Sequence, residues 1–154
     1  MVIDLLPLSG GDTKSVDFSF STSTDAEGAA DYLSGLDISG TGNIDVSGRV
    51  YDTAGCLMLE MEIKVSFGTH CSRCYNATET EFSTSVSCNV VTEDDIEDGS
   101  SILSDGRYVT LDDTVYSEVL MNFPHRVLCR EDCRGLCPVC GKDLNEGDCE
   151  HTVA

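Results

Sequence analysis

Three long stretches of the chain alternate apolar and polar residues with a period of two. Such alternation predicts β-strands with one buried and one wet face, and three in succession predict an antiparallel meander. A shorter alternation predicts an earlier strand at Val16, Phe18 and Phe20. The positions on the predicted buried face of the three long stretches are Ile44, Val46, Gly48 and Val50; Leu57, Leu59, Met61, Ile63, Val65 and Phe67; and Phe82, Thr84, Val86, Cys88 and Val90.

One good helix is predicted in the C-terminal half of the chain. Asp112 and Asp113 begin it, where their charges suit the positive end of the helix dipole, and Pro124 ends it. Its apolar stripe at helical spacing consists of Leu111, Val115, Tyr116, Val119, Leu120 and Phe123.

Two weaker features complete the predicted elements. Residues 24–33 predict a short helix, because Thr24 and Glu27 fit a capping box and Gly35 would stop it. The turn residues Ser104–Gly106 predict a hairpin between residues 102–103 and 108–111.

The pattern as a whole predicts an α+β fold, with a mainly antiparallel β-sheet or meander, one helix in the C-terminal half and a zinc-knuckle tail. We expect residues 1–128 to form a β-rich α+β domain that carries a Cys71/Cys74 knuckle. Residues 129–154 are expected to form a zinc-binding tail packed on it. Beyond Cys129 there is little apolar content, so this tail can fold only through its cysteines.

The charge of the chain limits its partners. With 28 acidic residues against 9 Lys and Arg, the formal net charge is −19. Such a surface repels phosphate, which argues against non-specific nucleic-acid binding. An acidic loop is predicted at residues 92–99, whereas five of the nine basic residues lie inside or beside the cysteine segments: Arg73, Arg126, Arg130, Arg134 and Lys142.

The cysteines point to a reducing compartment. Residues 1–8 lack the features of an export signal, and no stretch approaches the ~20 apolar residues of a membrane span. We therefore expect a cytoplasmic protein that does not contact membranes. Cysteines in such a protein serve more often as metal ligands than as disulfides, and the odd count of nine agrees with that.

Eight residues have the type and spacing of zinc ligands, which come in closely spaced pairs and number four per ion. Eight ligands make two tetrahedral sites, which predicts two structural zinc ions; proximity in sequence groups the last four into one site and leaves the first four for the other. A rival arrangement is one site from Cys71, Cys74, Cys137 and Cys140. The preferred groups are Cys71, Cys74, Cys129 and Cys133 for one ion, and Cys137, Cys140, Cys149 and His151 for the other.

Other interpretations of the cysteines are weaker. Iron also binds paired cysteines, but zinc is favoured, and a redox pair lacks the strand-then-helix context of thioredoxin. A catalytic zinc is not expected because four ligands fill each site. Cys56 and Cys88 are expected to have no metal-binding or catalytic role, and His70 and His125 are not expected to be metal ligands.

Arginines surround the predicted sites and have two interpretations. Four thiolates on one zinc ion leave a charge of about −2, which neighbouring cations would offset. Alternatively, these side chains contact RNA, for which this is the one suitable surface of an acidic protein. The residues concerned are Arg73, Arg126, Arg130 and Arg134.

The combined motifs resemble the bacterial YceD family, the large ribosomal RNA subunit accumulation proteins. The resemblance rests on Cys71-Ser-Arg-Cys74 after a strand, a helix ending in Phe123-Pro124, and the segment from Leu128 to Gly147. It implies a role in the accumulation or processing of large-subunit ribosomal RNA. One departure is His151, where the family pattern leads us to expect a cysteine.

Three functions remain open from the sequence. The first is a non-enzymatic zinc-binding factor in ribosome assembly, with the pre-ribosomal large subunit or a basic ribosomal protein as partner. The second is a zinc-stabilised protein-interaction adaptor unrelated to ribosomes, since a net charge of −19 suits any basic partner. The third is a thiol-based redox or metal-buffering protein.

Overall fold

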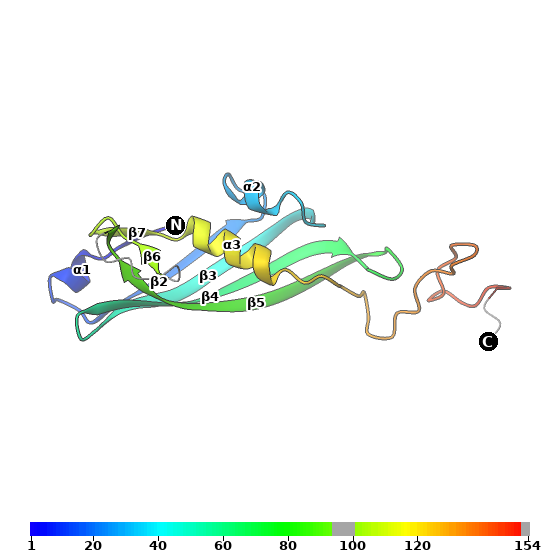
Figure 1. The fold of residues 1–154 in the computed structure, drawn as a ribbon. Coiled ribbons are helices and arrows are strands. Elements are labelled where there is room, and N and C mark those ends of the chain that lie inside the picture. Colours follow the sequence, from blue (N-terminus) through cyan, green and yellow to red (C-terminus); the bar gives the residue numbers. More distant parts are fainter. Residues whose placement is uncertain (94–100, 152–154) are drawn as a thin grey trace.

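The computed structural model describes residues 1–93 and 101–151 and is built on a meander of long strands (Figure 1). The predicted α+β class, with a mainly antiparallel sheet, is confirmed. A short last strand, β6, joins the sheet parallel to β5, which gives the order β2-β3-β4-β5-β6. The strands are β2 (Ser15–Ser23), β3 (Ser39–Thr53), β4 (Cys56–His70), β5 (Ala77–Val91) and β6 (Ile102–Leu103).

The predicted alternation is observed along the sheet. The antiparallel register places Val46 opposite Ile63, and Ile63 opposite Thr84, so that the apolar positions of neighbouring strands share one face. Val46 and Ile63 are completely buried, whereas Glu62 between two core positions is exposed. This burial of one face supplies most of the apolar core.

Helix α3 (Asp112–Asn122) lies across one face of the sheet, as Figure 1 shows. Val115 and Val119 are completely buried in the core. At the end of the helix, the ring of Phe123 packs on that of Phe67 with centroids 4.6 Å apart. The predicted stripe is wrong at Leu120, which is 42% exposed.

Short elements complete the fold at the N-terminal side. Two strands form a separate antiparallel pair, and two short helices contribute buried Leu8, Ala29 and Leu33 to the core. These elements are β1 (Val2–Asp4), β7 (Tyr108–Thr110), α1 (Leu6–Ser9) and α2 (Ala29–Leu33).

The capping-box prediction is wrong. Helix α2 begins only at Ala29 and has no side-chain cap, and the hydroxyl oxygen of Thr24 instead accepts a hydrogen bond from the Gly42 amide at 2.8 Å. Thr24 is therefore buried at the edge of the sheet and caps no helix.

The predicted hairpin around Ser104 is only partly present. The chain turns there, since the Asp105 amide donates to the Tyr108 carbonyl at 3.2 Å. However, the flanking strands belong to different sheets, because β6 pairs with β5 and β7 pairs with β1. Most of the predicted acidic loop, residues 94–99, lies outside the described residues.

Beyond α3 the chain runs past the end of the β4–β5 hairpin and forms an extended C-terminal segment (Figure 1). The helix ends before Pro124, as predicted. Within residues 1–93 and 101–151, no helix is long and apolar enough to cross a membrane. The division at residue 128 into a domain and a metal-binding tail stays a prediction.

Candidate metal centres

The first centre begins in the turn between β4 and β5. Cys71 directly follows β4, and two backbone hydrogen bonds close the turn around it. The Tyr75 amide donates to the Cys71 carbonyl at 2.9 Å, and the Cys71 amide donates to the Asn76 carbonyl at 2.9 Å. This tight turn carries both Cys71 and Cys74.

The segment after α3 is docked on this turn by polar contacts. The Ser72 amide donates to the Val127 carbonyl at 2.8 Å, and the Val127 amide donates to the Ser72 hydroxyl oxygen at 3.1 Å. Further along, the Arg73 guanidinium donates to the Cys133 carbonyl at 2.7 Å. These bonds bring Cys129 and Cys133 to the first pair.

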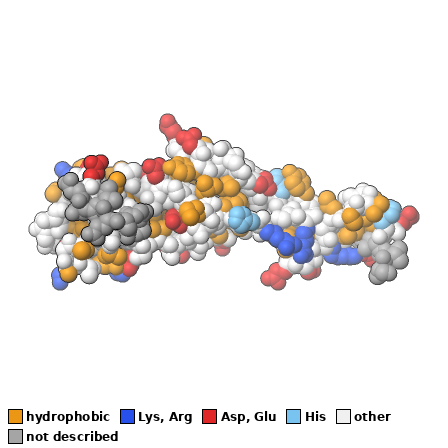
Figure 2. All heavy atoms as spheres, in the orientation of Figure 1, with side chains coloured by type: hydrophobic (Ala, Val, Ile, Leu, Met, Phe, Trp, Pro, Cys, Tyr) orange, Lys and Arg blue, Asp and Glu red, His pale blue; other side chains and the backbone are white. Residues whose placement is uncertain are grey.

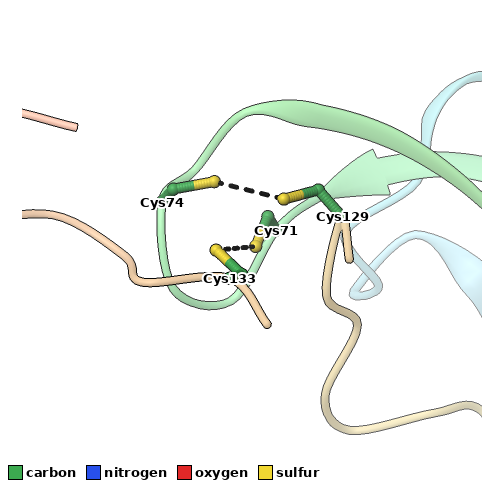
Figure 3. Close-up of side chains that lie close together, drawn as sticks. All are labelled: Cys71, Cys74, Cys129 and Cys133. Carbon is green, nitrogen blue, oxygen red and sulfur yellow. Dashed lines mark hydrogen bonds between the residues drawn. The ribbon is translucent and has the colours of Figure 1, made fainter. Parts of the chain in front are cut away.

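The four sulfur atoms of this group converge (Figure 3). The Cys71 and Cys133 sulfurs are 3.7 Å apart, those of Cys74 and Cys129 are 3.6 Å apart, and all four lie within 4.8 Å of one another. A disulfide would need about 2.05 Å. Zn–S bonds of about 2.3 Å in a regular tetrahedron give S···S edges of about 3.8 Å. The group therefore fits a four-coordinate metal ion.

The environment of this group favours the thiolate form at Cys71. Cys71, Cys74 and Cys133 are almost completely buried. Burial raises the pKa of Cys71, but hydrogen bonds from the amides of Cys74, Cys129 and Arg73 outweigh it and lower this pKa to about 6. Burial and the neighbouring sulfurs instead raise the pKa of Cys129 to about 12. Amide donors aimed at sulfur are the surroundings that a metal-bound thiolate needs.

The second centre is a turn of the same kind within the C-terminal segment. The Gly141 amide donates to the Cys137 carbonyl at 2.9 Å, and the Cys137 amide donates to the Lys142 carbonyl at 2.8 Å. Gly141 has a φ of +72°, which glycine adopts without strain. The four ligand atoms within 4.8 Å of one another come from Cys137, Cys140, Cys149 and His151.

Asn145, which lies between Cys140 and Cys149 in the sequence, contacts the first centre. Its side-chain amide donates to the Cys133 sulfur at 3.4 Å and to the Asp143 carboxylate at 2.7 Å. Its side-chain oxygen accepts hydrogen bonds from the Arg134 amide and the Arg130 guanidinium, both at 2.8 Å. No spacing or periodicity marks Asn145 in the sequence, so sequence reasoning missed it.

Comparison with known families decides the affiliation of the chain. The family described as "Large ribosomal RNA subunit accumulation protein YceD" matches residues 59–154, which is more than half of the sequence. The chain belongs to the YceD family. No curated protein matches the chain, and no solved structure does. The YceD match begins in β4 and includes all eight candidate ligands, whereas β2 and β3 precede it.

The structure groups the candidate cysteine ligands into two sites, as preferred from the sequence, and not into the single rival site of Cys71, Cys74, Cys137 and Cys140. Among the described residues, Cys71 and Cys74 meet Cys129 and Cys133, while Cys137 and Cys140 belong to the other group. All nine cysteines are described, and all are free of disulfides. Metal binding itself stays a prediction.

The remaining cysteines and histidines lie outside both groups. Cys56 is exposed, and Cys88 is half-buried against the core, where burial raises the pKa of its thiol. The His70 Nδ1 atom is 3.1 Å from an Asp37 carboxylate oxygen, and His125 is exposed.

The arginines near the two candidate metal centres differ in their ion-pair partners. Figure 2 shows Lys and Arg side chains gathered where the C-terminal segment leaves the sheet. Arg130 pairs with Asp132 at 3.3 Å, and Arg134 pairs with Asp148. RNA contact by Arg73, Arg126, Arg130 or Arg134 stays a prediction, but only the last two have carboxylate partners among the described residues.

We expect Asn145→Ala to weaken Zn²⁺ binding at the first centre. The substitution removes the hydrogen bond to the Cys133 sulfur and the connection to Arg130 and Arg134. Loss of such a supporting contact typically lowers metal affinity about 10- to 100-fold. Competition with a chromophoric chelator measures this, with Asn89→Ala on the exposed face of β5 as the matched control. An unchanged Zn²⁺ affinity in Asn145→Ala would show that Asn145 does not support metal binding at the first centre.

Proposed function

We propose that the two groups each bind a structural zinc ion. Sulfur and imidazole donors in sets of four are the usual ligands of structural zinc, and the S···S distances of 3.6 and 3.7 Å suit its tetrahedron. The histidine in the second group favours zinc over an all-cysteine iron site. Four donors per group leave no open position for a substrate, which supports a non-enzymatic role.

The metal content gives the first test. Mass spectrometry of the purified, undenatured protein is expected to find two zinc ions per chain. One ion per chain would restrict the proposal to a single centre. Iron instead of zinc, with the absorbance of an iron–thiolate site, would contradict the choice of metal.

The proposed biological role is support of large-subunit ribosomal RNA accumulation during ribosome assembly in the cytoplasm. The single observation that carries it is membership in a family named for that process. The net charge of −19 suits a basic ribosomal protein as partner, and free cysteines suit a reducing compartment. The pre-ribosomal large subunit is the proposed assembly in which the protein acts.

Deletion of the gene that encodes this chain, in its source organism, tests this role. We expect a lower ratio of large-subunit to small-subunit ribosomal RNA, restored by the wild-type chain and by the control Cys56→Ser. A chain with both Cys133→Ser and Cys140→Ser should fail to restore it. An unchanged ratio in the deletion strain, together with no co-sedimentation with large-subunit precursors, would favour an adaptor unrelated to ribosomes.

A further inference from the structure

The two cysteine turns share backbone features, but the residue after the second cysteine is Tyr75 in one and Gly141 in the other. After the second cysteine of each turn the backbone enters the left-handed region, with φ of +61° at Tyr75 and +72° at Gly141. Each of these residues donates the same 2.9 Å hydrogen bond to the carbonyl of the first cysteine. Glycine adopts this conformation freely, whereas a bulky side chain is strained in it. The turn therefore does not need a tyrosine.

Tyr75 also has no place in the core. Tyr75 is 70% exposed, and one face of its ring stacks on the ring of His70. The ring centroids are 4.5 Å apart, and the angle between the ring planes is 7°. The His70 ring is held by Asp37 at 3.1 Å. The stacking fixes the orientation of the tyrosine ring and leaves its other face open to solvent.

Two arginines with no carboxylate partner among the described residues belong to the two segments that meet at this turn. The Arg73 guanidinium donates to the Cys133 carbonyl and has no carboxylate partner among the described residues. Arg126 is exposed and, in the described part of the chain, has neither an ion pair nor a hydrogen bond. The two bonds between Ser72 and Val127 hold the segment that carries Arg126 against the turn that carries Arg73 and Tyr75.

We propose that the open face of Tyr75 stacks on an unpaired base of single-stranded RNA while Arg73 and Arg126 contact its phosphates. An aromatic ring and basic side chains are the two elements by which proteins hold single strands. The strain at Tyr75 fits a residue kept for binding rather than for folding. The inference rests on the proposed function and names its RNA contact.

Tyr75→Gly tests the ring without harming the turn. Because Gly141 serves the same position in the second turn, this variant should fold with at least wild-type stability and keep two zinc ions. Its affinity for a labelled, unstructured oligoribonucleotide should fall about 5- to 150-fold in fluorescence anisotropy. Arg126→Ala should reduce the slope of log affinity against log salt by about 0.7.

Tyr108→Ala is the matched control. Tyr108 is also exposed and has a guanidinium, that of Arg107, 4.8 Å from its ring centroid, but it lies on β7 and outside both cysteine groups. Its substitution should leave RNA affinity unchanged. Equal losses in Tyr75→Gly and Tyr108→Ala, or equal binding of duplex and single-stranded RNA, would overturn the stacking proposal.

The failure of this inference is distinguishable from that of the proposed function. If the wild-type chain co-sediments with large-subunit precursors but Tyr75→Gly binds the oligoribonucleotide as wild type does, the stacking contact is refuted and the ribosomal role stands. If Tyr75→Gly loses RNA affinity while deletion leaves ribosomal RNA ratios unchanged, the contact is supported and the ribosomal role is refuted.

Discussion

Cys133→Ser is expected to reduce the zinc content from two ions to one per chain and to release the segment beyond residue 127 from the turn between β4 and β5. Cys133 is buried within the first centre, and its sulfur is 3.7 Å from that of Cys71. In the described residues, Leu128 is the one additional hydrophobic side chain packed against this group. A structural zinc ion contributes about 10 kcal/mol or more, so its loss removes most of what holds the segment.

The matched variant is Cys140→Ser, which removes a ligand from the second centre only. It should also leave one zinc ion per chain, but residues 127–133 should stay protected from hydrogen exchange because the first centre is intact. In Cys133→Ser these amides should exchange rapidly, while the second turn around residues 137–142 remains protected. The two variants therefore have equal zinc content and opposite protection patterns.

Hydrogen exchange followed by mass spectrometry distinguishes the outcomes. The same loss of protection in both variants would mean that the two centres fold as one unit, coupled through Asn145. Retained protection at residues 127–133 in metal-free wild-type protein would contradict a metal-dependent fold for this segment.

Much of this candidate site could be predicted from the sequence because ligand spacing is local. Two residues between Cys71 and Cys74, and between Cys137 and Cys140, suffice to define a tight turn. Proximity along the chain grouped the four ligands of the second centre, and the first centre followed from the cysteines that remained. The contacts of Asn145 could not, because they depend on how two turns pack in space rather than on any period.

For the fold as well, features that depend on neighbouring residues could be predicted from the sequence, and features that depend on distant residues could not. Alternation along β4 predicted its buried face, since side-chain direction in a strand depends only on neighbouring residues. Thr24 was misread as a helix cap because its actual partner, Gly42, lies 18 residues away on another segment. The predicted hairpin around Ser104 formed only as a turn with one antiparallel bridge between Ser104 and Val109, because the choice of sheet partner for its flanking strands is not local.

Gly48→Ala is expected to lower the free energy of unfolding by about 3 kcal/mol, the upper part of the range for overpacking. Gly48 pairs with Met61 in the middle of the sheet, where a Cβ atom would lie 2.2 Å from the Glu60 carbonyl oxygen. That oxygen belongs to the backbone of β4, so relief requires the two strands to move apart. The absence of a side chain therefore permits the close approach of β3 and β4.

Urea denaturation monitored by circular dichroism measures this loss, and Gly35→Ala is the matched control. A Cβ atom at Gly35 would have no described atom within 4 Å, so its substitution should leave the unfolding midpoint nearly unchanged. Gly48→Ala should still bind two zinc ions, because both centres lie at or beyond the end of β4. Equal midpoints for the two variants would show that the strands adjust at Gly48 without cost; a lost zinc ion in Gly48→Ala would show that strand packing and the metal centres are coupled.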